Sequence, residues 1–316
     1  MKNNKNLNID LVYLWVDGND PQWLSKRNAF TENPEDNSES NCKGRYVNND
    51  DLKYSLRSAE KYAPWIRKIF IVTDNQIPDW LDVTNPKVKI IDHSEILPEK
   101  CLPCFNSSVI EYFLYKIPDL SEHFLYANDD MFFGKDISPD FFFNKDGFPI
   151  IRLIRKPFGK WHFKYKALIG KTIGQHRRKI INSSLLVEKM FGKYYSGIPH
   201  HNIDAYKKSD FRVAIEKIFN NNVEKSIPHH FRDDEDLHRS IIAYYVLAIG
   251  HGTLKHVGKR QSIRIFAYKP NFKKYILDYK PKLFCLNDDQ NVSDNDRLRI
   301  KPFLEELFPD KSSFEK

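Results

Sequence analysis

The chain has 316 residues, of which 41% are apolar and 29% charged, and this composition excludes an intrinsically disordered, collagen-like or coiled-coil protein. The formal net charge of +8 is divided unevenly: residues 1–150 carry 17 basic and 24 acidic side chains (net −7), and residues 151–316 carry 33 and 18 (net +15). We therefore expect a cation site in the first half and an anion site in the second. No apolar stretch is as long as a membrane span, and the N-terminus lacks the apolar core of a signal peptide, which predicts a cytoplasmic protein.

The first half predicts an α/β fold. Apolar stretches rich in β-branched and aromatic residues predict buried strands over residues 9–16, 68–74, 88–92 and 123–130. Helical periodicity or helix-start signals between them predict helices over residues 23–30, 50–62 and 107–115, and the polar residues 31–43 predict a mobile surface loop. Because strands alternate with helices, we expect a mainly parallel sheet.

The second half of the chain is basic, and we expect it to be mainly helical. Residues 147–187 contain no Asp or Glu, and the aromatic residues Phe158, Trp161, Phe163 and Tyr165 lie among their cations. Unpaired Lys and Arg are seldom buried, so these cations predict either an anion-binding wall or a solvated surface. Further helices are expected over residues 235–250 and 294–308. We divide the chain into an α/β half (1–146), a basic insert (147–196) and a C-terminal part (197–316) that completes the same domain.

Carboxylates follow the predicted strands. Asp17, Asp74, Asp92 and Asp129 each stand at a strand end, and the carboxyl edge of an open α/β sheet is where ligands bind. Each one singly could instead cap a helix or form a turn. Asn128-Asp129-Asp130 is the sharpest feature, because two adjacent carboxylates beside an amide offer hard oxygen ligands for Mg²⁺ or Mn²⁺.

Other residues suggest how phosphates would be held. The sequence has 12 glycines and no glycine-rich phosphate loop, so arginine, lysine and metal must do this. His200 and His201 are candidates for a general base or for packing histidines, and Arg232 is a candidate phosphate clamp. The pair Cys101 and Cys104 has the spacing of half a zinc site, with reduced thiols as the alternative.

Several motifs resemble the Stealth family of sugar-phosphate transferases. The stretch 9–23, with Asp17 and Gly18, resembles the first family signature, and residues 51–81, with Arg57, resemble the second. Further resemblances include Asn106 with Glu111, Asn128-Asp129-Asp130, Phe231-Arg232 and the stretch 285–309. The third signature departs from the family pattern, because His200-His201 follows Pro199 and lacks the usual later proline. The downstream spacing favours His201 as the active histidine and leaves His200 as the alternative.

The resemblance implies a GT-A-like nucleotide-sugar fold and a bacterial capsule or surface-polysaccharide enzyme. It implies transfer of sugar-1-phosphate from a UDP-sugar, with Mg²⁺ or Mn²⁺, to a glycan or lipid-linked glycan, giving a phosphodiester and UMP. We assign Asp129 and Asp130 to the metal. Substrate binding is assigned to Asp17, Gly18, Arg57, Asn106, Asn128 and Arg232, and catalysis to His201 (or His200), Arg232 and Asp130.

Two other functions stay open from the sequence: a glycosyltransferase that releases UDP, and a non-catalytic polysaccharide-binding protein. We expect no nucleic-acid partner, and the oligomeric state is open. The basic insert is expected to contact either the acceptor or the anionic inner face of the membrane.

Overall fold

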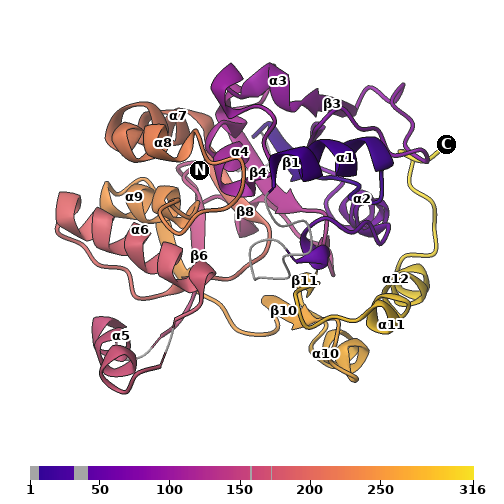
Figure 1. Ribbon diagram of the computed structural model, residues 1–316. Coiled ribbons are helices and arrows are strands. Elements are labelled where there is room, and N and C mark those ends of the chain that lie inside the picture. The colour runs from indigo at the N-terminus through magenta and orange to yellow at the C-terminus, as the bar shows by residue number, and fades with distance from the viewer. Residues whose placement is uncertain (1–6, 32–41, 157–158, 172) are drawn as a thin grey trace.

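The computed structural model describes residues 7–31, 42–156, 159–171 and 173–316. A parallel sheet of the first half forms the centre, with helices on both of its faces (Figure 1). The surface loop predicted over residues 31–43 lies almost entirely outside the described residues. Among those residues, no helix combines the length and apolar character needed to cross a membrane.

The central sheet has the strand order β3-β2-β1-β4-β8. The strands β1 to β4 are mutually parallel, and β8 pairs antiparallel with β4. Four of the five strands match the predicted ones, which confirms the mainly parallel α/β sheet. Their bounds are β1 Ile9–Leu14, β2 Ile69–Thr73, β3 Val88–Asp92, β4 His123–Asn128 and β8 Asp204–Lys207.

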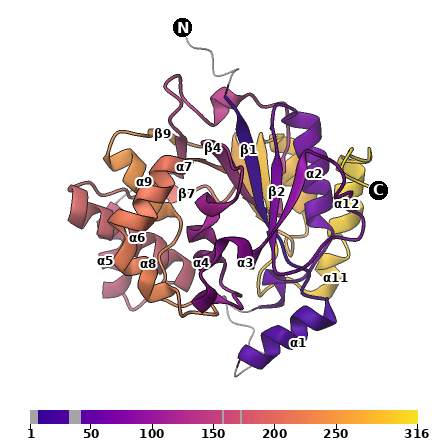
Figure 2. The ribbon, with the colours of Figure 1, turned by 90° about the horizontal axis from the view of Figure 1, so that it is seen from above.

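Alternate residues of these strands enter two hydrophobic cores. Leu11 and Ile71 pack in the core on one face, and Val12 and Val72 pack in the core on the other. A strand covered on both faces needs apolar residues at successive positions, which explains the nearly continuous apolar runs in the sequence. Figure 2 shows α2 on one side of β1 and β2, with α3 and α4 on the other.

Helix α2 (Asp51–Tyr62) confirms the predicted periodicity, because Leu52, Leu56 and Ala59 form its buried stripe. The predicted helix 107–115 is present as α4 and a following 3-10 turn. The other helices and turns of the first half are α1 Pro21–Phe30, α3 His93–Ile96, α4 Ser107–Tyr112, and the 3-10 turns Lys43–Arg45, Glu99–Cys101, Leu114–Lys116 and Pro139–Phe141.

The basic insert contributes β6 (Ile150–Ile154), α5 (Gly159–Leu168) and α6 (Gln175–Phe191). β6 pairs with β7 (Ile198–Pro199) and β9 (Thr253–His256) in a small sheet. α6 packs against α9 (Ser240–Ala248), which begins five residues later than predicted because Asp233 and Asp236 form a turn first. α7 (Lys208–Val213), a π-helical turn (Ala214–Ile218) and α8 (Asn220–Ser226) complete this side.

A third sheet lies beyond the central one. β10 (Ser262–Phe266) and β11 (Leu283–Asn287) are parallel, and β5 (Met131–Phe133) pairs antiparallel with β11. This pairing carries the end of β11 to the end of β4, where the acidic pair lies. α10 (Phe272–Tyr279) packs here, and the predicted C-terminal helix is divided into α11 (Asp294–Arg297) and α12 (Ile300–Leu307).

Candidate active site

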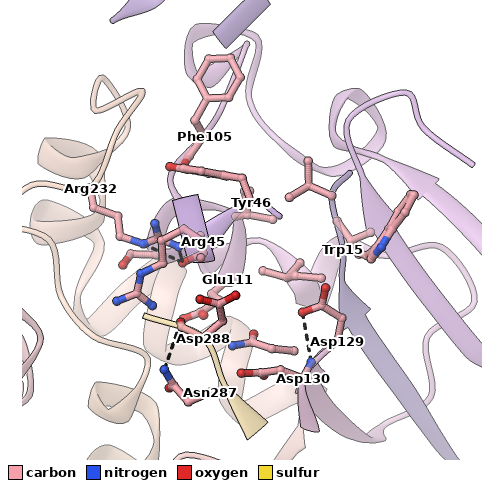
Figure 3. A pocket seen from close by; sticks show the side chains of 18 of the residues that line it. Trp15, Arg45, Tyr46, Phe105, Glu111, Asp129, Asp130, Arg232, Asn287 and Asp288 are labelled. Atoms are coloured by element: carbon pink, nitrogen blue, oxygen red, sulfur yellow. Dashed lines mark hydrogen bonds between the residues drawn. The ribbon is translucent and has the colours of Figure 1, made fainter. Parts of the chain in front are cut away.

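A cavity of about 200 Å³ opens at the carboxyl edge of the central sheet. It is lined by the ends of β1 and β4, the start of α2 and α6, and the residue that follows β11. Figure 3 shows Asp129 and Asp130 at one end, Arg45 and Arg232 at the other, and Glu111 and Asp288 between them; the aromatic side chains Tyr46 and Phe105 also line the cavity. The edge predicted from the strand-end carboxylates is therefore hollow and lined by charged groups, as ligand sites of open α/β sheets are.

The acidic end brings together Asp51, Asp129, Asp130 and Asp288, all of which line the cavity. Leu286 donates a backbone hydrogen bond of 3.0 Å to the carbonyl oxygen of Asp130, which holds β11 against the acidic pair. Cys285 donates its thiol hydrogen to Oδ2 of Asp130 at 3.2 Å. In contrast, Oδ1 of Asp130 and Oδ1 of Asp51 are buried without a hydrogen-bond partner among the described residues.

Asp51, Asp129 and Asp130 repel one another in a buried space, whereas Asp288 has Arg297 as an ion-pair partner at 2.7 Å. Burial, reinforced by the charge of Asp130, raises the pKa of Asp129 to about 8. Burial raises the pKa of Asp130 to about 6, even though Cys285 donates a hydrogen bond to it. Burial and the same two neighbours raise the pKa of Asp51 well above its ordinary value. A bound cation would stabilise the ionised form of these carboxylates and so lower their pKa values.

The residues present fit a magnesium ion that completes its ligands from a diphosphate. Within the described ranges, no three His, Cys, Asp or Glu side chains form a full metal cluster. Mg²⁺ in phosphate-transfer sites is commonly held by one or two carboxylates together with substrate phosphates. The unpartnered Oδ1 of Asp130 and the neighbouring Asp129 provide that number of carboxylates.

The opposite wall is cationic and internally braced. Arg239 is buried between Glu111 (3.4 Å) and Asp204 (3.3 Å). Although burial alone would lower it, the pKa of Arg239 is held well above its ordinary value by Glu111 and Asp204. Arg45 and Arg232 also line the cavity. Arg45 and Arg232 therefore bring positive charge to this wall, and Arg239 is held in place by its two carboxylate partners.

Three histidines from distant segments meet on this wall. The ring of His176 lies 5.8 Å from that of His201 and 5.0 Å from that of His238, both edge-on. Burial, with nearby arginines such as Arg264, lowers the pKa of His201 well below its ordinary value. Burial likewise lowers the pKa of His176 to about 3. Burial therefore favours the neutral form of these imidazoles, in which one ring nitrogen is a hydrogen-bond acceptor.

The structure separates the two candidate histidines. His201 lines the cavity, and its backbone has the left-handed φ of 53°, uncommon for a residue other than glycine. His200 is buried outside the lining, where its ring nitrogens lie 2.7 Å from the Ser262 hydroxyl and 3.0 Å from Asp204. The geometry therefore places His201, and not His200, in the lining of the cavity.

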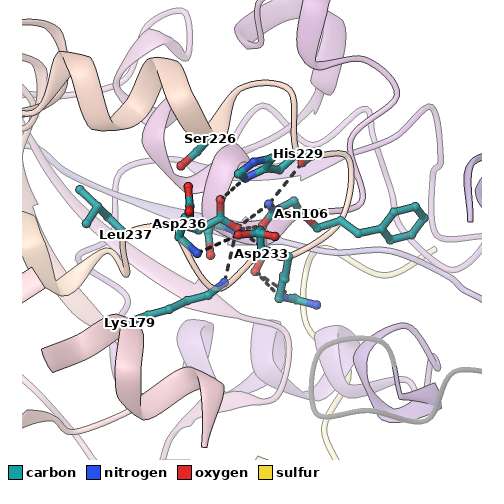
Figure 4. A network of polar contacts seen from close by, with 12 residues as sticks. Asn106, Lys179, Ser226, His229, Asp233, Asp236 and Leu237 are labelled. Atoms are coloured by element: carbon teal, nitrogen blue, oxygen red, sulfur yellow. Dashed lines mark hydrogen bonds and ion pairs between the residues drawn. The ribbon is translucent and has the colours of Figure 1, made fainter. Parts of the chain in front are cut away.

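Asn106 and Arg232 are joined through one loop. Asn106 caps α4 by accepting from the Ser108 amide (3.1 Å) and donates to the carbonyl of Phe231 (3.0 Å) and to Asp236 (2.8 Å). Figure 4 shows Asn106 within a network around Asp236. Asn106 is fully buried outside the lining, and it holds the loop that carries Arg232 into the cavity.

Asp17 and Gly18 lie in the turn after β1, beside the lining and not in it. Asp17 accepts from the Asn19 amide (2.9 Å) and the Asn48 side chain (3.1 Å). A Cβ on Gly18 would lie 2.5 Å from the Tyr46 carbonyl oxygen, so this position needs glycine for close packing. The structure shows both residues shaping the rim that Tyr46 belongs to.

Arg57 lies away from the cavity. Its guanidinium donates two hydrogen bonds of 2.8 Å to the carboxylate of Glu315 and one of 2.7 Å to the Phe308 carbonyl. Although burial opposes it, the hydrogen bond from Arg57 lowers the pKa of Glu315 to about 2. Because Arg57 fastens the C-terminal segment to α2, we leave it out of the proposed substrate contacts.

Two expectations for the basic insert need correction. Lys179 is buried and forms an ion pair of 3.4 Å with Asp236, and Arg152 is buried and donates to the carbonyls of Ile150 and Phe141. The prediction that these cations are exposed to solvent or bind a ligand anion is therefore wrong for these two side chains, because Lys179 has a carboxylate of the protein as its partner and Arg152 has backbone carbonyls. Phe158 and the side chains of Lys160 and Phe163 lie outside the described residues.

Sequence reasoning gave no role to several residues of the cavity. Asp288 follows β11 as Asp129 follows β4, so the same strand-then-carboxylate pattern could have indicated it. Nothing in the local sequence signals Asp51 at the start of α2. The wall residues His176, His238 and Arg239 also lacked a local signal.

These features define an α/β protein with a charged site at the carboxyl edge of its sheet. Family models match it in three places: Stealth protein conserved region 1 over residues 8–34, conserved region 2 over residues 45–151 and conserved region 4 over residues 274–316. The chain belongs to the Stealth family.

Curated polysaccharide phosphotransferases align with 91–98% of the chain. The exopolysaccharide phosphotransferase cps2G of Lactiplantibacillus plantarum is 33% identical over 98% of this chain and 96% of its own. The capsular polysaccharide phosphotransferase WcwK of Streptococcus pneumoniae is 30% identical (97% and 99%), and fcs1 of Haemophilus influenzae is 34% identical (91% and 80%). Among solved structures, the galactosyltransferase LgtC aligns over 96% of both chains with 12% identity and a TM-score of 0.48, a likeness that concerns chain topology alone.

Proposed function

We propose that this protein is an enzyme that transfers a sugar-1-phosphate from a UDP-sugar to a hydroxyl of a surface or capsular glycan. The product is a phosphodiester, and UMP is released. One observation carries the proposal: uncompensated carboxylates and a braced cationic, histidine-containing wall face each other across a single cavity. The polysaccharide phosphotransferases among its relatives support the same reaction class.

Asp129 and Asp130 would hold the divalent cation, and Asn128 beside them would contact the donor. A bound Mg²⁺ supplies charge neutralisation for the diphosphate and the departing phosphate. The chain itself supplies the rest: Arg232 would contact the phosphate oxygens from the other wall, where fixed positive charge stabilises the charge that develops in the transition state.

His201 would act as the general base. The acceptor oxygen bonds to the phosphorus that bears the sugar, its proton passes to the neutral imidazole of His201, and the bond from that phosphorus to the bridging oxygen breaks as UMP leaves. Because the anomeric carbon–oxygen bond is retained, the donor's anomeric configuration is kept in the product. Asp130 would contribute to catalysis by holding the divalent cation.

Location and acceptor are part of the same proposal. The four cysteines, Cys42, Cys101, Cys104 and Cys285, are all buried and free, which agrees with a reducing compartment such as the cytoplasm. The acceptor would be a glycan, free or lipid-linked.

The identity of the released nucleotide tests the proposal. The protein is incubated with a panel of UDP-sugars, Mg²⁺ and an oligosaccharide acceptor, and nucleotides are separated by chromatography. We expect UMP in equal amount to the phosphodiester formed. Accumulation of UDP would identify a glycosyltransferase, and glycan binding without either nucleotide would identify a polysaccharide-binding protein.

A further inference from the structure

Helix α5 projects from the body of the protein. Figure 1 shows it apart from the other helices and sheets, beyond the end of β6. Its exposed apolar residues are large: Trp161 is 76% exposed, Tyr165 61% and Leu168 85%. Isolated exposed apolar residues are ordinary in soluble proteins, but several on one short helix mark a surface that contacts something else.

These apolar residues share one face. Trp161, Tyr165 and Leu168 are spaced i, i+4 and i+7, the pattern of a single helical stripe. Ile169, directly after the end of the helix, is also exposed. The stripe therefore presents two aromatic side chains and one aliphatic side chain to the outside over about 10 Å of helix.

The surroundings of the stripe are cationic. Lys164 lies with its ammonium 5.5 Å from the Trp161 ring centroid, and Arg155, Lys156 and Lys171 are exposed on the flanking segments. Residues 147–187 contain no acidic side chain that could neutralise them within the segment. The partner of this surface must therefore combine an apolar layer with negative charge.

We propose that α5 is an interfacial helix that docks the protein onto an anionic phospholipid surface. Trp and Tyr favour the boundary between headgroups and acyl chains, and Lys and Arg beside them meet anionic headgroups. Helix α6 begins seven residues after α5 ends, and its first residues, Gln175 and His176, line the cavity. Docking through α5 therefore holds the cavity close to the membrane surface, where a lipid-linked acceptor would be presented.

Co-sedimentation with vesicles tests this docking. The wild-type protein should bind vesicles of phosphatidylcholine mixed with phosphatidylglycerol, bind pure phosphatidylcholine far more weakly, and be released as salt is raised. The double variant Trp161→Ser/Leu168→Ser should bind the anionic vesicles at least about tenfold more weakly, because it loses the insertion of two apolar side chains. Lys164→Glu/Lys171→Glu should weaken binding mainly at low salt.

A matched control is available on another face. Leu298 is 73% exposed in the turn between α11 and α12, so Leu298→Ser removes an equally exposed apolar side chain and should leave vesicle binding unchanged. Failure of the wild type to bind anionic vesicles, or equal binding by the Trp161→Ser/Leu168→Ser variant, would overturn the proposal.

If α5 binds something other than a membrane, the two experiments below would show it, and either result would overturn the proposal. If the wild type self-associates in sedimentation velocity and the double variant does not, the stripe covers a second copy. If the double variant raises the KM for a soluble acceptor about tenfold without vesicles, the stripe binds glycan.

This inference stands apart from the proposed function. UMP release with a soluble acceptor should be unchanged in the double variant. A wild type that binds anionic vesicles and releases no UMP would overturn the proposed reaction and leave the docking surface intact.

Discussion

Buried charged groups have partners on one wall of the cavity, whereas on the other wall two carboxylate oxygens have none among the described residues. On the cationic wall, Arg239 has Glu111 and Asp204 as partners, and Lys179 has Asp236. On the acidic wall, Oδ1 of Asp130 and Oδ1 of Asp51 are buried without a hydrogen-bond partner among the described residues. A buried charge with a partner fixes geometry, whereas a buried charge without one costs stability unless a ligand supplies the counter-charge.

The same contrast exists between equivalent strand ends. Asp74 follows β2 and forms an ion pair of 2.8 Å with Lys26, and Asp92 ends β3 and caps α3 by accepting from the Ser94 amide at 2.9 Å. Both carboxylates are therefore explained by local structure. Asp129 and Asp130 occupy the corresponding place after β4 and are the ones left facing the cavity. Position at a sheet edge is thus not enough to identify a ligand site; the missing partner is what distinguishes it.

The largest effect is expected from the acidic wall. Asp130→Asn should lower the rate of UMP release by about 10³ or more, because charge neutralisation by the metal is worth several kcal/mol in the transition state. The variant should remain folded, and its thermal midpoint without metal should equal or exceed that of the wild type, because one of the repelling carboxylates is gone.

Asp74→Asn is the matched control for this prediction. It removes a strand-end carboxylate that already has Lys26 as its partner, so UMP release should remain close to wild type. Near-normal activity of Asp130→Asn, or full activity of the wild type in excess chelator, would disprove the metal role of the acidic wall.

The next effect separates the two neighbouring histidines. His201→Ala should lower the rate about 10²–10⁴-fold, the usual contribution of a general base, without a large loss of stability. His200→Ala should instead lower the free energy of unfolding by about 1–3 kcal/mol, since Ser262 and Asp204 lose a buried partner. Rates and urea unfolding curves of both variants decide between them. A rate loss confined to His200→Ala would transfer the base to His200.

The sequence predicted one wall better than the other for a physical reason. Asn128, Asp129 and Asp130 follow directly after an apolar strand, so a local pattern contains both the strand and its ligands. The cationic wall is assembled from α6, the turn before β8 and the turn before α9. Side chains brought together by tertiary packing leave no mark on local sequence, and His176 and His238 went unnoticed for that reason.

The misplaced residues illustrate the same limit. Arg57 occupies a family motif, yet its partner Glu315 is 258 positions away and the contact is structural. Lys179 lies in a segment that contains no acidic residue, and its partner Asp236 comes from a different loop. The sequence of the segment alone therefore suggests that Lys179 is unpaired. Composition reports how many charges a segment carries, and only the fold reports which of them are paired.

A smaller effect is expected from the pairs that brace the cationic wall. Asp236→Ala should lower the free energy of unfolding by about 3 kcal/mol, because Lys179 and Asn106 are left buried with unmet polar groups. Asp234→Ala is the matched control, since Asp234 pairs with the neighbouring Arg178 at half-exposed positions and should cost less than about 1 kcal/mol. Equal losses in urea unfolding would show that burial of the pair does not matter.

The smallest predicted effect is a loss of folding stability at acidic pH that is caused by the buried histidines of the cationic wall. Burial lowers the pKa of His176 to about 3, whereas in the unfolded chain it titrates near 6.5. Between these values the unfolded state binds more protons than the folded state, so stability falls as pH falls below about 6.5 and is fully present above it. From pH 7.5 to pH 5.5, His176 alone should cost about 1 kcal/mol. In urea unfolding at the two pH values, His176→Gln should lose that part of the pH dependence, and the exposed-site variant His256→Gln should keep it. An identical pH dependence in wild type and His176→Gln would mean that His176 is not held neutral by the fold, and the cationic wall would then carry one more charge than its geometry implies.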